Sequence, residues 1–414
     1  MLQIAVMGHG IVGSGVLEVF YKNLESMERK TGKEMDIKYV LDLRDFPGLP
    51  YSNKFIKDFE IIINDSEISI VVELMGGLEP AFTYVRRCLE AGKSVVTSNK
   101  ELVAEKGAEL LRIAHESDVN FFFEASVGGG IPIIRPLHAC LVANEIDEIA
   151  GILNGTTNFI LTKMIHEKMK FKQALELAQS LGYAEKDPTA DIEGQDACRK
   201  ICILASLAFG RHVYPDEVYT EGISKITYED IEYAKAWGGV VKLIARAKRL
   251  VNGKITAMVC PAFVSSESQL AGVENVFNAV LVRGDATGEV VFYGRGAGKL
   301  PTASAVVADI IDAANSQHNS VSLRWEDNPA RDCVEKYENN PVRFYVRVCY
   351  DNFDKAMKVA SDIFGIIKPM YRAGEDDEFA FLIDVKTEKE AAELLHKMEE
   401  RGISVLSKIR VLDI

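Results

Sequence analysis

Short apolar runs alternate with amphipathic stretches along residues 1–135. Strands are predicted at residues 2–7, 36–41, 68–74, 94–97 and 120–125, and helical periodicity follows the first strand and returns at residues 80–91. Strands and helices that alternate in this way are typical of a doubly wound α/β domain with a parallel sheet. We therefore predict that residues 1–135 form such a domain.

The pattern is mixed from residue 136 to residue 300. Strands are predicted at residues 145–153, 254–263 and 279–283, and helices at residues 171–181 and 240–250. A polar turn at residues 154–158 leads into a further helix. We expect an α+β domain in which helices cover a sheet, followed by a helix at residues 301–315 that belongs with the first domain.

A polar segment with two prolines, residues 316–341, is predicted to be a linker. Beyond it, strands are predicted at residues 342–350, 366–371, 378–385 and 404–411, and helices at residues 354–364 and 388–401. The order β-α-β-β-α-β is that of a small ferredoxin-like module, which we expect over residues 342–414.

The stretch from Gly182 to Lys200 begins as a loop and ends inside a helix. Pro188 keeps the residue before it out of helical geometry, and Asp191 is predicted to cap a helix that Gly210 ends.

Asp196 and Lys200 lie four residues apart, so they share one face of this helix, beside its apolar stripe. An acid and an amine at the edge of a core are candidates for proton transfer. The alternative is an ordinary surface ion pair.

A glycine-rich turn joins the first strand to the first helix, with the sequence Gly8-His9-Gly10-Ile11-Val12-Gly13. Gly8 permits a tight turn, Gly10 lets the backbone approach a pyrophosphate, and Gly13 allows close packing of helix on strand. We predict a dinucleotide site here and hence a Rossmann-type domain. A glycine-rich turn without a ligand is the alternative.

Two further features bear on the cofactor. Asp42 and Arg44 follow the second predicted strand. An acid at this position would bind the ribose 2′-hydroxyl of NAD, whereas an arginine would bind the 2′-phosphate of NADP. The sequence therefore does not decide between NAD and NADP. A second glycine-rich turn, residues 292–302 with Gly298, precedes a helix; it either closes over the cofactor or is a simple helix entry.

The carboxyl ends of two other predicted strands carry candidate ligands. Ser98 and Lys100 follow residues 94–97, at the edge where open α/β sheets bind ligands, and Lys100 faces either a ligand or solvent. Glu124 precedes a turn with three consecutive glycines, whose carbonyls either hold a monovalent cation or serve the turn alone.

Composition limits the classes of partner. The chain has 48 Lys and Arg against 61 Asp and Glu, a net charge of −13, which argues against general binding to nucleic acid or to anionic membranes. The seven cysteines are scattered and form no C-x-x-C pair, which indicates reduced thiols, a cytoplasmic setting and no zinc site. We find no secretory signal pattern and no apolar run of membrane-spanning length.

Several separated motifs resemble those of homoserine dehydrogenase of the bacterial monofunctional type, over essentially the whole chain. They lie at residues 8–13, 96–100, 124–132, 151–158, 182–200 and 296–302. The tail resembles an ACT domain, a module that often binds amino acids. The resemblance implies reversible NAD(P)-dependent interconversion of L-aspartate 4-semialdehyde and L-homoserine, in threonine, methionine and isoleucine biosynthesis.

The resemblance also implies a role for particular residues. Lys200 matches the catalytic lysine, and Asp196 the carboxylate that assists it. The implied substrate-binding residues are Glu185, Asp191, Thr156 and Lys100. The implied cofactor-binding residues are Gly8, Gly10, Ile11, Val12, Gly13, Arg44, Ser98, Lys100 and Gly298. The implied sodium ligands are Glu124, Val127, Gly129 and Ile131.

Two alternative functions predict different sets of motif residues. Another two-domain oxidoreductase would share the dinucleotide motif but not the spacing of Glu185, Asp196 and Lys200, and a catalytically inactive NAD-binding regulator would have lost one of these three. The resemblance also implies a dimer through the middle domain or a tetramer through pairing of the tails. The turn after the first tail strand, residues 350–354, has neither Pro nor Gly, unlike the usual ACT effector turn, so an amino-acid effector stays open.

Overall fold

Within residues 1–316, six strands form a parallel sheet in the order β3-β2-β1-β4-β5-β6. Their bounds are Leu2–Met7 (β1), Met35–Leu41 (β2), Phe55–Ile56 (β3), Ile68–Glu73 (β4), Ser94–Thr97 (β5) and Phe121–Phe122 (β6). This is the strand order of dinucleotide-binding folds, so the predicted doubly wound domain is confirmed. The computed structural model describes residues 1–316, 323–372, 374–375 and 377–414.

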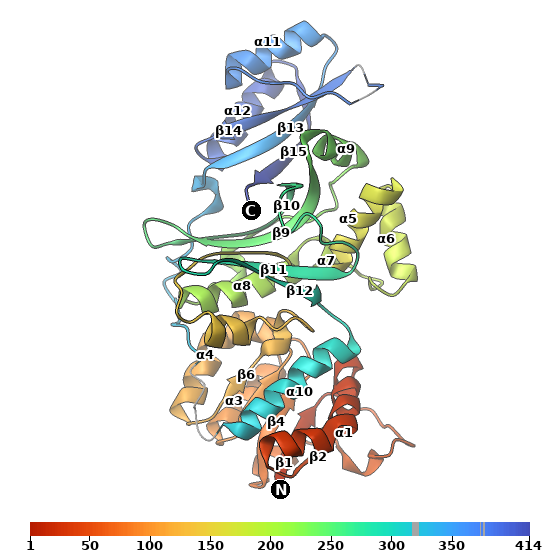
Figure 1. Cartoon of the computed structure of the whole chain (residues 1–414), viewed down its shortest axis with the longest axis vertical. Helices are drawn as coiled ribbons and strands as arrows, with labels where there is room; N and C mark the ends of the chain where they lie inside the picture. The colour runs from red at the N-terminus through yellow and green to blue at the C-terminus, as the bar shows by residue number, and fades with distance from the viewer. Residues whose placement is uncertain (317–322, 373, 376) are drawn as a thin grey trace.

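Helices cover both faces of this sheet (Figure 1). They are α1 (Ile11–Thr31), α2 (Glu60–Asn64), α3 (Ala81–Glu90), α4 (Lys100–Glu116) and α10 (Lys299–Asn315). α10 returns to the first domain and packs closely on α1. The two helices are so close at Gly15 that a Cβ there would lie 2.9 Å from Cγ of Lys299. β6 is shorter than predicted, since the chain turns into a 3₁₀ segment at Glu124–Ser126.

Among the described residues, nine strands form a second, mixed sheet in the order β12-β11-β7-β9-β10-β15-β13-β14, with β8 beside β10. Its middle-domain strands are β7 (Ile146–Ile152), β8 (Tyr219–Thr220), β9 (Gly239–Arg249), β10 (Ile255–Ser265), β11 (Phe277–Gly284) and β12 (Gly288–Arg295). The middle-domain helices are α5 (Gly155–Glu167), α6 (Phe171–Ser180), α7 (Thr189–Ile192), α8 (Gln195–Phe209) and α9 (Tyr228–Trp237).

The helix predicted at residues 240–250 is wrong, because these residues form β9 between β7 and β10. Val241, Leu243 and Ala245 belong to the main core, whereas Ile244 packs in a separate cluster on the other face of the sheet. A strand covered on both faces gives a continuous apolar run, which periodicity does not distinguish from a buried helix.

The tail contains β13 (Val342–Cys349), α11 (Phe353–Phe364), β14 (Glu378–Val385), α12 (Glu388–Glu400) and β15 (Ser404–Leu412). The strand predicted at residues 366–371 is reduced to a single antiparallel bridge between Met370 and Ala380. Residues 373 and 376, and residues 317–322 of the predicted linker, lie outside the described part. β15 pairs in parallel with β10 over Ala262–Val264, so the tail strands extend the middle sheet.

Buried ion pairs fasten the tail to the middle domain. Arg347 of β13 binds Asp230 of α9 at 3.2 Å. Arg410 of β15 is almost fully buried and binds both Glu388, at 2.6 Å, and Glu221 of the middle domain, at 2.6 Å. Both arginines therefore link the tail directly to the middle domain.

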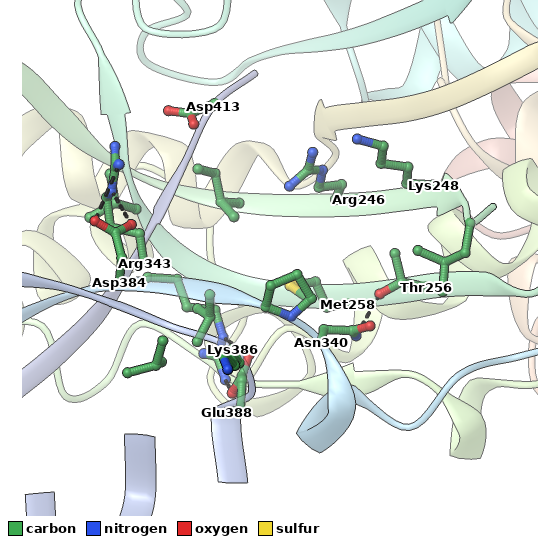
Figure 2. Close-up of a pocket in the computed structure, with 17 residues that line it drawn as sticks. Arg246, Lys248, Thr256, Met258, Asn340, Arg343, Asp384, Lys386, Glu388 and Asp413 are labelled. Carbon is green, nitrogen blue, oxygen red and sulfur yellow. Dashed lines mark hydrogen bonds and ion pairs between the residues drawn. The ribbon is translucent and has the colours of Figure 1, made fainter. Parts of the chain in front are cut away.

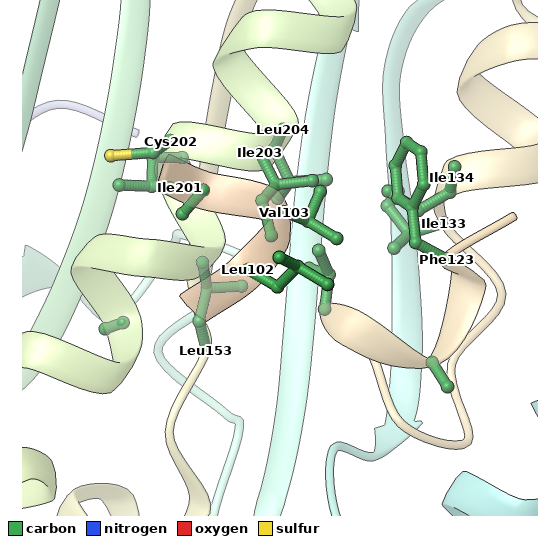
Figure 3. Packing of buried hydrophobic residues seen from close by; sticks show 14 of the residues in the cluster. Leu102, Val103, Phe123, Ile133, Ile134, Leu153, Ile201, Cys202, Ile203 and Leu204 are labelled. Atoms are coloured by element: carbon green, nitrogen blue, oxygen red, sulfur yellow. The ribbon is translucent and has the colours of Figure 1, made fainter. Parts of the chain in front are cut away.

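One apolar cluster runs through the first and middle domains. Figure 3 shows Leu102 and Val103 of α4 close to Ile201 and Leu204 of α8. This packing sets the beginning of α4 beside the beginning of α8. In the part of the chain that the structure describes, no helix is long and apolar enough to cross a membrane.

Candidate active site

The ammonium of Lys200 is held by two acceptors inside the protein. Its Nζ donates to Oδ2 of Asp196 at 2.8 Å and to the carbonyl oxygen of Leu153 at 2.7 Å. The side chain is only 9% exposed. An ammonium has three N–H donors, so one is left without a partner among the described residues and is available to a ligand.

A second lysine reaches the same carboxylate from the other domain. Nζ of Lys100, the first residue of α4, lies 2.7 Å from Oδ1 of Asp196. Burial favours the neutral form of Asp196, but Lys200 and Lys100 outweigh it and hold the pKa of this carboxyl below its usual range. Burial lowers and Asp196 raises the pKa of Lys100, with a net rise. Asp196 is therefore ionised between two cations.

Asn154 connects the carboxylates of this cluster. Its Nδ2 donates to Oδ1 of Asp191 at 2.7 Å and to Oδ2 of Asp196 at 2.9 Å, while its Oδ1 caps α5 by accepting from Thr157 N. Burial, together with the charge of Asp196, raises the pKa of Asp191. Asn154 was not among the predicted site residues, although its place at the strand–helix turn of residues 154–158 was a signal.

Asp191 does not cap the helix that carries Lys200, so that prediction is wrong. Asp191 lies in the short α7, and α8 begins only at Gln195. Gly194 precedes it with a φ of 81°, a left-handed conformation that interrupts the chain between the two helices. The predicted end of the helix at Gly210 is confirmed.

Glu185 lies on an exposed loop, and its carboxylate forms no hydrogen bond or ion pair with any described residue. The loop itself is fixed, because Thr156 Oγ1 donates to the carbonyl of Tyr183 at 2.6 Å and Gln179 Nε2 donates to the carbonyl of Glu185 at 3.0 Å. Thr156 thus positions the loop that carries Glu185 and has no direct hydrogen bond to Lys200 among the described residues.

The first glycine-rich turn has the shape of an anion cradle. A Cβ on Gly8 would lie 2.8 Å from the carbonyl of Leu74, and one on Gly13 would lie 2.1 Å from the carbonyl of Gly8, so neither position has room for a side chain. No described atom lies within 4 Å of a Cβ on Gly10. α1 starts at Ile11 and Val12 without a side-chain cap, so its first N–H groups are free for a pyrophosphate.

Asp42 and Arg44 bind each other at the end of β2. The Asp42 carboxylate accepts from Arg44 Nε at 3.0 Å, Arg44 Nη2 at 2.9 Å and His9 N at 2.8 Å. The hydrogen bond from Arg44 keeps the pKa of Asp42 below its usual range despite partial burial. The Arg44 side chain is still 63% exposed.

A buried acid shapes the sheet edge beside Ser98. Glu73 accepts from Met75 N at 2.7 Å and from Thr97 Oγ1 at 2.6 Å, and Thr97 Oγ1 accepts from Asn99 N at 2.9 Å. Burial raises the pKa of Glu73. Glu73 was not among the residues predicted from the sequence. The signal for it was an acidic residue at the end of an apolar strand.

Glu124 acts as an acceptor for the start of a following helix. Its carboxylate accepts from Ile133 N at 2.6 Å, Ile134 N at 2.9 Å and Arg135 N at 2.8 Å, and its own N–H donates to Asp309. Asp309, which the sequence did not indicate, has its pKa raised by burial and by Glu124.

The turn after Glu124, which includes Val127 and Ile131, packs against the second glycine-rich turn. A Cβ on Gly129 would lie 2.4 Å from the carbonyl of Gly296, and Gly298 is the N-cap residue of α10. Within residues 1–316, 323–372, 374–375 and 377–414, no group of three or more His, Cys, Asp or Glu side chains is arranged to hold a metal ion.

Comparison with known proteins gives consistent matches. The family model described as Homoserine dehydrogenase, NAD binding domain matches residues 8–124, and the model described as Homoserine dehydrogenase matches residues 132–311. Homoserine dehydrogenase of Bacillus subtilis is 39% identical over 370 residues, which are 87% of this chain and 85% of that protein. That of Lactococcus lactis is 43% identical over 316 residues, covering 75% and 73%.

Solved structures of the same family also match this chain. A homoserine dehydrogenase from Thiobacillus denitrificans superposes with a TM-score of 0.90 at 36% identity, covering 100% of this chain and 98% of that one. A hyperthermophilic archaeal homoserine dehydrogenase mutant in complex with NADPH has a TM-score of 0.65 at 32% identity and covers 75% of this chain and 97% of that one.

Proposed function

This chain belongs to the homoserine dehydrogenase family, and we propose that the cluster around Lys200 carries out its reaction. The protein is an NAD(P)-dependent oxidoreductase that interconverts L-aspartate 4-semialdehyde and L-homoserine. The observation that carries our assignment of residues is the buried arrangement in which Asp196 lies between Lys200 and Lys100.

Lys200 is the proton donor and acceptor in this proposal. When bound, the nicotinamide supplies or accepts the hydride at the reacting carbon. Negative charge develops on the aldehyde oxygen, and the free N–H of the Lys200 ammonium stabilises this charge and delivers the proton. Asp196 and the Leu153 carbonyl occupy the other two donors, so they orient the ammonium toward the substrate.

The substrate amino group needs an anionic partner. Glu185 offers an exposed carboxylate on the loop that Thr156 fixes, and Asp191 offers a second one beside Asp196. We assign Glu185 to the ammonium of the substrate and Asp191 to the wall of the same pocket. Lys100 reaches from the dinucleotide domain to Asp196, and we assign it to the side of the same pocket that faces the cofactor.

For the cofactor, we propose that the site at Gly8–Gly13 accepts NADP. Arg44 neutralises Asp42 and remains largely exposed, so its guanidinium is available to a 2′-phosphate. Gly10 and the first N–H groups of α1 would hold the pyrophosphate. Ser98 and Gly298, on the turns at the end of β5 and the start of α10, complete the assigned cofactor contacts.

We also propose a sodium site at the turn after Glu124. The donors would be the Glu124 carboxylate and the carbonyls of Val127, Gly129 and Ile131. The residue types fit a monovalent cation, since carboxylate and carbonyl oxygens are the ligands that a hard cation prefers.

Assembly and location are further parts of this proposal that rest on the family. We propose a homodimer or homotetramer in the cytoplasm. Sedimentation velocity of the purified protein tests the assembly, and a monomer at all concentrations would contradict it.

The decisive experiment replaces Lys200 by Ala and compares steady-state kinetics with homoserine and NADP. We expect kcat to fall by about 10²- to 10⁴-fold, the usual contribution of a positioned acid–base group, while dinucleotide binding is unchanged. Lys172→Ala, at an exposed position on α6, is the control and should keep its kcat. A kcat within a few-fold of the wild-type value would rule out Lys200 as the proton donor.

A further inference from the structure

The middle and tail parts of the large sheet separate around a cavity. β15 pairs with β10 only over Ala262–Val264, and closer to the start of β10 the two parts diverge. Thr256 and Met258 line the resulting cavity of about 690 Å³, which we call the junction pocket (Figure 2). This volume is in the range of small-molecule sites.

The walls of the junction pocket carry more basic than acidic side chains. Five basic side chains line it, against three acidic ones, in a chain of net charge −13. The basic residues are Arg246, Lys248, Arg343, Lys386 and Arg410. The acidic residues are Asp384, Glu388 and Asp413. An excess of positive charge inside a concave site attracts anions.

Two of the basic residues are already paired with acids of the same pocket. Arg343 binds Asp384 at 2.7 Å, and Arg410 binds Glu388 at 2.6 Å. Arg410 is also fixed to Glu221 of the middle domain at 2.6 Å, so this wall is rigid before any ligand binds. A preformed wall lowers the entropy cost of binding.

The positive charge that remains faces the cavity from two sides. Arg246 uses its Nε for the buried Glu148, at 2.5 Å, and its two terminal nitrogens have no partner in the described part of the chain. Among the described residues, neither Lys248 nor Lys386 has a carboxylate partner. Figure 2 draws Arg246 and Lys248 along β9, with Lys386 beside Glu388 on the tail side.

We propose that the junction pocket binds a small dianion, of the size of a phosphate monoester or a dicarboxylic acid. One anionic group is bound by Lys248 and the free end of Arg246, and the other charge by Lys386. The ligand thereby bridges the middle domain and the tail. Its site lies at the opposite end of β13 from residues 350–354, so it is separate from the usual ACT effector turn.

Calorimetric titration of the full-length protein tests this site, with pyrophosphate and succinate as probes at constant ionic strength set by chloride. Wild type should bind one of them with saturable heat. Tighter binding of pyrophosphate would identify a phosphate ligand, and tighter binding of succinate a dicarboxylate. Lys248→Gln and Lys386→Gln should each raise Kd about tenfold, the effect of losing one charged partner worth about 1.4 kcal/mol.

Lys389→Gln is the matched control, because Lys389 is an exposed lysine of α12 that does not line the pocket. Its Kd should equal that of wild type. The proposal is overturned if neither probe binds, or if binding persists unchanged in both Lys248→Gln and Lys386→Gln, as it would for pyrophosphate held at Gly8–Gly13. The assay does not use catalysis, so its failure is distinguishable from failure of the proposed function.

Discussion

Nζ of Lys100 lies 2.7 Å from Oδ1 of Asp196, and this contact joins the dinucleotide domain to the helix that carries Lys200. The two residues are far apart in sequence and belong to different domains. Their ion pair places the start of α4, at the end of the parallel sheet where the cofactor is expected, next to Lys200, the proton donor that we propose.

Replacing Lys100 by Met should lower kcat with homoserine by about 10- to 100-fold, because Asp196 loses one of its two cations and the domains lose an alignment contact. The loss should be smaller than for Lys200→Ala. Arg112→Met, at an exposed position of the same helix, is the control. An unchanged kcat would mean that the Lys100 contact is only structural.

Asp191→Asn should increase stability at neutral pH while raising KM for homoserine. Burial, with the Asp196 charge, raises the pKa of Asp191 in the folded protein, so the folded state binds this proton more tightly than the unfolded chain does. Ionisation of Asp191 therefore lowers the free energy of unfolding as the pH rises through its folded pKa. Asn removes that cost and keeps an acceptor for Asn154.

Urea unfolding at about pH 7 and about pH 3 measures this effect, since the unfolded pKa is about 3.9. The gain from Asp191→Asn should appear at the higher pH and vanish at the lower one. Asp147→Asn, at an exposed position of β7, is the control. A variant less stable than wild type at neutral pH would contradict the argument.

Arg44→Ala should change cofactor preference. The 2′-phosphate of NADP would lose a charge-assisted contact, worth about 1.5–3 kcal/mol, so kcat/KM with NADP should fall by about 10- to 100-fold. The value with NAD should change little, because Asp42 becomes available to the ribose hydroxyls. Arg29→Ala on α1 is the control, and equal losses with both cofactors would refute the assignment.

Exchange of sodium for tetramethylammonium should lower the thermal midpoint of the wild-type protein if a cation is bound by the folded state at Glu124. Glu124→Gln should abolish the difference between the two salts, even though the variant is less stable overall because Glu124 accepts three backbone N–H groups. The same midpoint for wild type in both salts would argue against the site.

Some features of the fold depend on short-range rules, and these were predictable. The turn from Gly8 to Gly13 needs positions without a Cβ, and only glycine meets this need. Asp196 and Lys200 are neighbours because a helix places residues four apart on one face, and the 2.8 Å contact follows from that. The family motifs were recognisable for the same reason, since each is a short segment with a local geometry.

Other features exist only through contacts between distant segments. Residues 239–249 form a strand because both faces of the sheet around them are covered, which a local pattern does not reveal. Asn154 became part of the site because α5 and α8 start close together.

The sequence by itself determined the alternating α/β pattern of residues 1–135, the glycine turns and the Asp196–Lys200 pair. Only the tertiary structure decided which residues from other domains join that pair, because the position of Lys100 depends on how α4 packs on α8. Pairings between distant residues follow from the packing of whole elements, and no local periodicity encodes that packing.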